Sequence, residues 1–197
     1  MTKYTHIFEE ALKTARSISN EYSRASALGE IASELAKAGE PYQHIFEEVL
    51  EIARDISDEY NRTSALSEIA SGLAKAGEFE RALEIARSIS DEHDCSSVLS
   101  DIALERAKSG EFKEALEIAR SFSDEYSEYS SDALSDIASE FAKAGESEEA
   151  LKIARTFSDK HDRASALSNI ALGLAKTGEP YMHTFGEALE TARGCIQ

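Results

Sequence analysis

The feature that most constrains the fold of this chain is an internal repeat. The segment SALSEIASGLAKAGEFERALEIARSIS at 64–90 returns with small changes along the whole sequence. Two anchors mark it: an Ala-Arg pair, at 15–16, 53–54, 86–87, 119–120, 154–155 and 192–193, and a glycine followed by glutamate, at Gly39, Gly77, Gly110, Gly145 and Gly178. A period of 33 to 38 residues is typical of helical-repeat proteins, in which a unit buries its apolar face only against its neighbours.

Each repeat has the pattern of two amphipathic helices, which we call helix A and helix B. In the second repeat, the apolar residues from Leu66 to Leu73 recur at i, i+3, i+4 and i+7, which is one face of a helix. Gly77 follows as the residue that lets helix A end in a left-handed turn. A second apolar stripe over 79–89 then predicts helix B.

The repeats predict an all-α fold, an α-solenoid of five and a half repeats with eleven helices. We expect one domain over 1–197, without a linker. It begins with a lone B helix at 4–18 and continues with A–B pairs at 20–57, 58–90, 91–123, 124–158 and 159–196.

Five residues are inserted after the glycine in the first and last pairs, at 41–45 and 180–184. Each insertion begins with one of the two prolines of the chain, Pro41 and Pro180. Proline is tolerated in the first turn of a helix. The sequence therefore predicts that these two B helices are one turn longer, with proline in the first turn.

Composition and charge restrict the function. The formal net charge of −17 repels nucleic acids and anionic membranes. No apolar stretch approaches the length of a membrane span, and the two cysteines, Cys95 and Cys195, lie far apart in sequence. We expect a cytoplasmic location. No phosphate loop, Gly-x-Ser-x-Gly motif or Cys/His cluster is present, so we expect no enzymatic activity, no cofactor and no metal site.

The repeat resembles the tetratricopeptide pattern of alternating small and large residues. The residues that carry the resemblance are Leu66, Ile69, Ala70, Leu73, Gly77, Phe79, Ala82 and Leu83. The sequence from Gly72 to Gly77 is also similar to that of pentatricopeptide repeats, and the choice between the two families stays open. The aromatic residue expected in the middle of helix B is Ala86 here, and the proline that usually ends a tetratricopeptide unit is absent.

The two resemblances imply different functions. A tetratricopeptide-like array implies a scaffold that binds a peptide or a protein segment in a groove lined by the A helices. A pentatricopeptide-like array implies binding of single-stranded RNA through an early A-helix position. The residues at that position are mostly acidic, which disfavours RNA: Glu30, Glu68, Asp101, Asp136 and Asn169. A catalytic site formed across the groove is the third interpretation.

The predicted groove floor is rich in hydroxyl groups and ends in a row of lysines. Such a surface suits a partner segment with acidic side chains. The alternative for the lysines is structural, because a cation in the last turn of a helix is stabilised by the helix dipole. The candidate residues are Ser33, Lys37, Ser67, Ser71, Lys75, Ser100, Lys108, Ser135, Ser139, Lys143, Ser168 and Lys176.

The terminal repeats carry a candidate end interface for self-association or partner docking, because apolar residues of the last helix have no following helix to cover them. Its residues are Tyr42, His44, Tyr181, His183, Phe185 and Leu189. An aromatic or histidine residue also recurs between helix B and the next helix A, at Tyr22, Tyr60, His93, Tyr126 and His161. The arginines of the Ala-Arg pairs are expected to bond this same turn or its Asp and Glu residues, with anion binding as the alternative.

Overall fold

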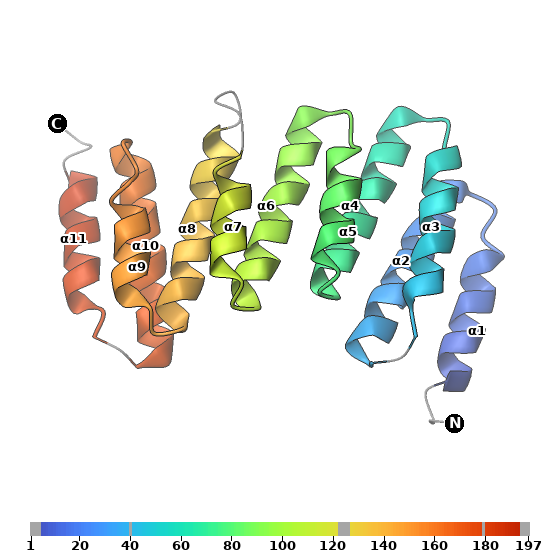
Figure 1. Cartoon of the computed structure of the whole chain (residues 1–197), viewed down its shortest axis with the longest axis horizontal. Helices are drawn as coiled ribbons and strands as arrows, with labels where there is room; N and C mark the ends of the chain where they lie inside the picture. The colour runs from blue at the N-terminus through green and yellow to red at the C-terminus, as the bar shows by residue number, and fades with distance from the viewer. Residues whose placement is uncertain (1–4, 40, 122–126, 179, 194–197) are drawn as a thin grey trace. The chain divides into compact units, whose positions relative to one another are not determined.

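The computed structural model describes residues 5–39, 41–121, 127–178 and 180–193 (Figure 1). Within these ranges all regular structure is helical, in eleven helices, which confirms the predicted all-α fold of helix-turn-helix repeats. The helices are α1 Thr5–Arg16, α2 Glu21–Lys37, α3 Gln43–Asp55, α4 Glu59–Lys75, α5 Phe79–Arg87, α6 Glu92–Lys108, α7 Phe112–Ala119, α8 Ser127–Lys143, α9 Ser147–Ala154, α10 Lys160–Thr177 and α11 Met182–Arg193. Even-numbered helices are A helices and odd-numbered helices are B helices.

The chain divides into two compact units, residues 1–98 and 99–197. In the first unit, α2 packs against α1, α3 and the next A helix, α4, which in turn packs against α5. In the second unit, α8 packs against α7, α9 and α10, and α10 packs against α9 and α11. Each unit therefore has the neighbour-to-neighbour packing of helical repeats. The single domain over 1–197 stays a prediction.

The core of each unit combines alanines with a few large side chains. Ala70 and Ala82, predicted to lie where helices A and B touch, are both completely buried. Phe46, Ile69 and Ile137 are among the largest side chains with almost no exposure. Small residues let the helix axes approach, and the large ones fill the space between them. No helix in the described part of the chain is both long and apolar enough to cross a membrane.

The glycine of each repeat ends helix A as the sequence predicts. Gly77 has a φ of 80°, and the other four glycines at this position also have positive φ. The turn is closed by the Glu78 amide, which donates to the carbonyl of Leu73 at 2.9 Å. An L-residue would be strained here because its Cβ approaches the following carbonyl.

The two B helices with insertions are longer, as predicted. α3 has 13 residues and α11 has 12, whereas α5 has nine and α9 has eight. The prediction that the prolines lie in the first helical turn is wrong, because each stands two residues before the helix begins. Tyr42 occupies the N-cap position of α3, and its ring packs edge-on against Phe46 with centroids 5.8 Å apart.

Candidate functional site

The accessible surface of the A helices is clearest on α4, where one stripe of side chains remains reachable by solvent. Tyr60 and Lys75 are exposed at its two ends, and Ser64, Ser67 and Ser71 are half-buried between them. The Ser67 hydroxyl donates to the carbonyl of Thr63 within the helix at 2.9 Å. The stripe therefore presents small polar side chains, and a lysine stands at its C-terminal end.

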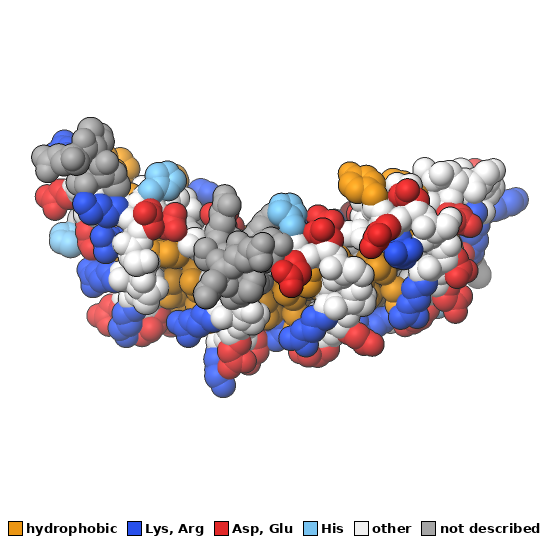
Figure 2. Space-filling view, turned by 90° about the horizontal axis from the view of Figure 1, so that it is seen from above, with side chains coloured by type: hydrophobic (Ala, Val, Ile, Leu, Met, Phe, Trp, Pro, Cys, Tyr) orange, Lys and Arg blue, Asp and Glu red, His pale blue; other side chains and the backbone are white. Residues whose placement is uncertain are grey.

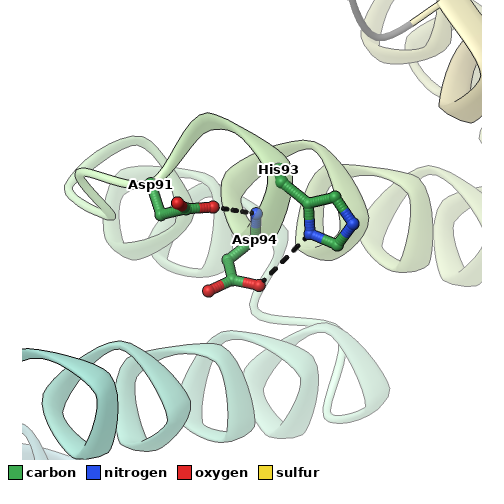
Figure 3. Close-up of side chains that lie close together, drawn as sticks. All are labelled: Asp91, His93 and Asp94. Carbon is green, nitrogen blue, oxygen red and sulfur yellow. Dashed lines mark hydrogen bonds and ion pairs between the residues drawn. The ribbon is translucent and has the colours of Figure 1, made fainter.

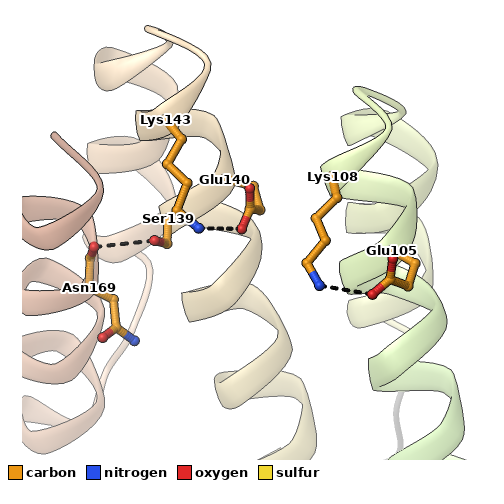
Figure 4. A network of polar contacts seen from close by, with 6 residues as sticks. All are labelled: Glu105, Lys108, Ser139, Glu140, Lys143 and Asn169. Atoms are coloured by element: carbon orange, nitrogen blue, oxygen red, sulfur yellow. Dashed lines mark hydrogen bonds and ion pairs between the residues drawn. The ribbon is translucent and has the colours of Figure 1, made fainter. Parts of the chain in front are cut away.

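Several of the predicted groove serines lie between neighbouring A helices. In the second unit, the Ser139 hydroxyl of α8 donates to the Asn169 carbonyl of α10 at 3.2 Å (Figure 4). The Asn169 side-chain amide donates to Ser135 at 3.0 Å, and Ser135 is buried. In the first unit, Ser33 of α2 faces Gly72 of α4. These serines hold A helices together, and their role in binding a partner stays a prediction.

The remaining predicted serines, Ser100 and Ser168, are half-buried on α6 and α10. The Ser168 hydroxyl donates to the Ala164 carbonyl at 2.8 Å, which repeats the bond that Ser67 makes on α4. A hydroxyl bonded to the carbonyl four residues earlier can still accept a hydrogen bond from a ligand. Both residues remain candidates for partner contact.

The five lysines of the row are exposed and fall into two classes. Lys37, Lys108 and Lys143 pair with the glutamate three residues earlier, at 2.7, 2.8 and 2.5 Å. Figure 4 shows the pairs of Lys108 and Lys143. The hydrogen bond to Glu105 raises the pKa of Lys108. Lys75 and Lys176 have glycine three residues earlier, at 72 and 173. The intrahelical glutamate partner is therefore missing for these two.

The glycines at 72 and 173 are explained by close helix packing, which the sequence did not reveal. A Cβ on Gly72 would lie 2.8 Å from the Ser33 hydroxyl and 3.3 Å from the ring of Phe46. A Cβ on Gly173 would lie 3.0 Å from the backbone oxygen of Ser139. A glutamate at Gly72 would have to displace the side chains of Ser33 and Phe46, and one at Gly173 would press on the backbone of α8. Packing thus decides which lysines lack the glutamate.

The acidic row on the A helices is accessible to solvent, with Glu30, Glu68, Asp101 and Asp136 all exposed. Figure 2 shows acidic and basic side chains interspersed over one face of the molecule. Partial burial raises the pKa of Asp136, and the nearby carboxylates of Asp132 and Glu140 raise it further. A negative charge is therefore already unfavourable at this place, which would also hold for an incoming phosphate.

We expect Asp136→Asn to stabilise the protein at neutral pH. A carboxyl whose pKa is raised by folding contributes stability when protonated and loses it as the pH rises through the folded pKa. The thermal midpoint at pH 7 should rise by about 1–2 °C, as for a surface change of about 0.5 kcal/mol. Thermal melts followed by circular dichroism check this. The gain should vanish well below pH 3.8, the ordinary pKa value, and an equal gain at both pH values would contradict the assignment.

Two arginines of the Ala-Arg pairs, Arg16 and Arg155, pair with the next B helix and not with the expected turn, and for the other four the expectation stays a prediction. Arg16 donates to Glu48 of the next B helix at 2.6 Å, and Arg155 pairs with Glu187 of α11 at 3.4 Å. A different arginine, in the first turn of helix A, bonds the preceding turn. Arg24 donates to the Ile18 carbonyl at 2.9 Å, and Arg62 donates to that of Ile56 at 3.1 Å.

The residues of the candidate end interface belong to both units of the chain. Tyr42 is half-buried inside the first unit, where its hydroxyl donates to Glu78 at 2.9 Å. His44 is exposed on α3. The residues from the last repeat are all exposed: Tyr181, His183, Phe185 and Leu189. Their role as an interface stays a prediction.

Two exposed clusters of aspartate and histidine begin helices α6 and α10. In the first, Asp91 accepts a hydrogen bond from the Asp94 amide at 2.9 Å, and His93 lies 3.4 Å from Asp94 (Figure 3). In the second, Asp159 accepts from the amides at 161 and 162, which lowers its pKa. Capping of the helix N-terminus accounts for both aspartates, and we assign no metal to either cluster.

Two hollows lie beside B helices in the described part of the chain, and none of the predicted groove residues lines either of them. One is lined by side chains of α3 and α5, including Arg54, Arg81 and Glu84. The other is formed by α9, α10 and α11 and includes Arg155, Lys160 and Glu187. Charges of both signs line each hollow, so neither selects one kind of ion.

No family model and no curated protein matches this chain. Among solved structures, it is similar to Ton1535 from Thermococcus onnurineus NA1, at 20% identity and a TM-score of 0.39, over 94% of this chain and 72% of that one. It is also similar to nearly identical TPR-like repeats of a putative kinesin light chain from Podosopora anserina, at 16% identity and a TM-score of 0.47, over 90% and 96%. A point variant of those repeats gives 14% identity and a TM-score of 0.47, over 91% and 100%.

Proposed function

We propose that this chain is a non-enzymatic scaffold that binds a peptide or protein segment along the accessible stripes of its A helices. The observation that carries the proposal is the split of the lysine row. Lys75 and Lys176 are exposed and lack the glutamate that neutralises the other three. They are the cations best able to pair with acidic side chains of a partner.

The surroundings of these lysines favour a protein partner over RNA. The stripe next to Lys75 includes the exposed carboxylate of Glu68, which accepts a hydrogen bond from Tyr22 at 3.0 Å. A net charge of −17 opposes binding of the phosphate backbone. A partner with a few spaced carboxylates can meet single lysines without approaching the acidic row. A cytoplasmic location stays a prediction.

Affinity purification followed by mass spectrometry tests the class of partner, and a lysine comparison then tests the site. Lys75→Ala combined with Lys176→Ala should weaken binding of the purified partner about 5–30-fold, if each lysine forms an exposed ion pair in the upper part of the usual range, about 0.5–1 kcal/mol. Lys108→Ala combined with Lys143→Ala is the matched control and should change affinity less than about threefold. Isothermal titration calorimetry measures both. Equal effects of the two double variants would contradict the site, and co-purified RNA would favour the pentatricopeptide-like alternative.

A further inference from the structure

The packing between the first two complete repeats shows how one hairpin covers another in this chain. Hairpin α2–α3 meets the next A helix, α4, at Gly72. The Ser33 hydroxyl and the Phe46 ring lie 2.8 and 3.3 Å from the place that a Cβ on Gly72 would occupy. Both side chains therefore converge on one small residue of the covering helix.

Two tyrosines complete this interface with hydrogen bonds to carboxylates. The Tyr22 hydroxyl donates to Glu68 of α4 at 3.0 Å. The Tyr42 hydroxyl donates to Glu78, the N-cap residue of α5, at 2.9 Å. The covering hairpin thus supplies a glycine at the centre of the contact and acidic residues at its edge.

The last hairpin, α10–α11, presents an uncovered version of the same face. The repeat alignment places Leu172 at the position of Ser33 and Phe185 at that of Phe46. Phe46 is 1% exposed, whereas Phe185 is 43% and Leu172 is 58% exposed. At the positions of the two tyrosines stand His161 and Tyr181, and both are exposed. The apolar centre and its polar edge are both present, and no described helix covers them within residues 99–197 (Figure 1).

The contacts of the chain argue against a second copy as the occupant. The A helices that carry a glycine at the repeat position of Gly72 are α4 and α10. Gly72 of α4 is already covered by Ser33 and Phe46, and Gly173 of α10 is covered by Ser139. A second copy therefore has no uncovered glycine of this kind to offer within its described helices.

We propose that the face of α10–α11 formed by His161, Leu172, Tyr181 and Phe185 binds an acidic helical hairpin from another polypeptide segment. Its first helix carries a glycine against Leu172 and Phe185, and its carboxylates accept hydrogen bonds from His161 and Tyr181. Leucine in place of Ser33 makes this face more apolar than its covered equivalent, which favours burial. The proposal does not depend on the lysines of the A-helix stripe.

A synthetic peptide of residues 58–90, which contains α4 and α5, is the probe. Labelled peptide is titrated with the full-length chain and followed by fluorescence anisotropy. We expect saturable binding that weakens at least tenfold with Leu172→Asp in the chain, and also with Gly72→Leu in the peptide. Ile7→Asp on α1, an exposed apolar residue outside this face, is the matched control and should leave binding unchanged.

A second arrangement removes the cost of folding a free peptide. A copy of residues 59–90 is joined after residue 197, so that four residues separate it from Arg193, as four separate Arg54 from Glu59. We expect its thermal midpoint to exceed that of the same fusion carrying Leu172→Asp by several degrees. Equal midpoints of the two fusions, together with no binding of the peptide up to a chain concentration of about 1 mM, would overturn the proposal. So would a dimer of the unmodified chain that Leu172→Asp dissociates, because that result assigns the face to a second copy.

Discussion

Phe46→Ala is expected to destabilise the protein by about 3–5 kcal/mol, which is the usual cost of removing a buried phenylalanine ring. Phe46 is 1% exposed, lies against Gly72 of α4 and packs edge-on with Tyr42. Removing the ring leaves a cavity between two repeats that the helices cannot close without moving. Urea denaturation followed by circular dichroism measures the change, and the thermal midpoint should fall by roughly 6–20 °C.

Phe185→Ala is the matched control, because Phe185 holds the same repeat position and is 43% exposed. Its loss should cost less than about 1 kcal/mol, since little apolar area leaves the core. An equal cost at both positions would mean that Phe185 is buried in solution. It would then contradict the uncovered face on α10–α11.

Gly173→Leu is expected to cost about 3 kcal/mol through overpacking. The Cβ alone would lie 3.0 Å from the Ser139 backbone oxygen and 3.3 Å from the Cβ of Ala142. A backbone atom cannot rotate away, so α8 and α10 must separate to admit a side chain. The expected result is a lower urea midpoint with both repeats of the second unit affected, because α8 and α10 share an extensive contact.

Gly186→Ala provides the comparison within a neighbouring helix. A Cβ on Gly186 of α11 would have no atom within 4 Å. Alanine is favoured over glycine in a helix interior by about 1 kcal/mol. This variant should therefore be slightly more stable than the unmodified protein. A loss of stability in Gly186→Ala similar to that of Gly173→Leu would show that glycine in these helices matters for a reason other than packing.

The structural roles of residues that act within a single helix or turn were predictable from the sequence. Gly77 could be recognised as a helix terminator because its left-handed conformation depends on the turn alone. Ala70 and Ala82 could be placed in the core because the helical period puts them on the apolar face. The pairing of Lys37 with Glu34 also follows from helical spacing. The part of the candidate site made of such residues was therefore visible in the sequence.

Residues whose role depends on a second helix were not predictable in the same way. Arg16 was expected to bond the next turn, but it pairs with Glu48, a residue 32 positions away in the sequence. Gly72 looked like an ordinary part of the repeat, although it is the point where two neighbouring repeats meet. Arg106 is buried at an apolar position of the repeat and pairs with Glu111 at 3.1 Å. The helical period does not reveal these contacts, because each of them joins residues of two different helices or of a helix and the cap of the next.

The sequence by itself determined the helices, their order and the glycine ends of the A helices, because periodicity and glycine turns act within one hairpin. The tertiary structure decided which equivalent positions are covered. Phe46 and Phe185 share one sequence context, yet one is buried under α4 and the other faces solvent. Burial in a repeat protein depends on which neighbour is present, and that depends on where in the array a repeat stands.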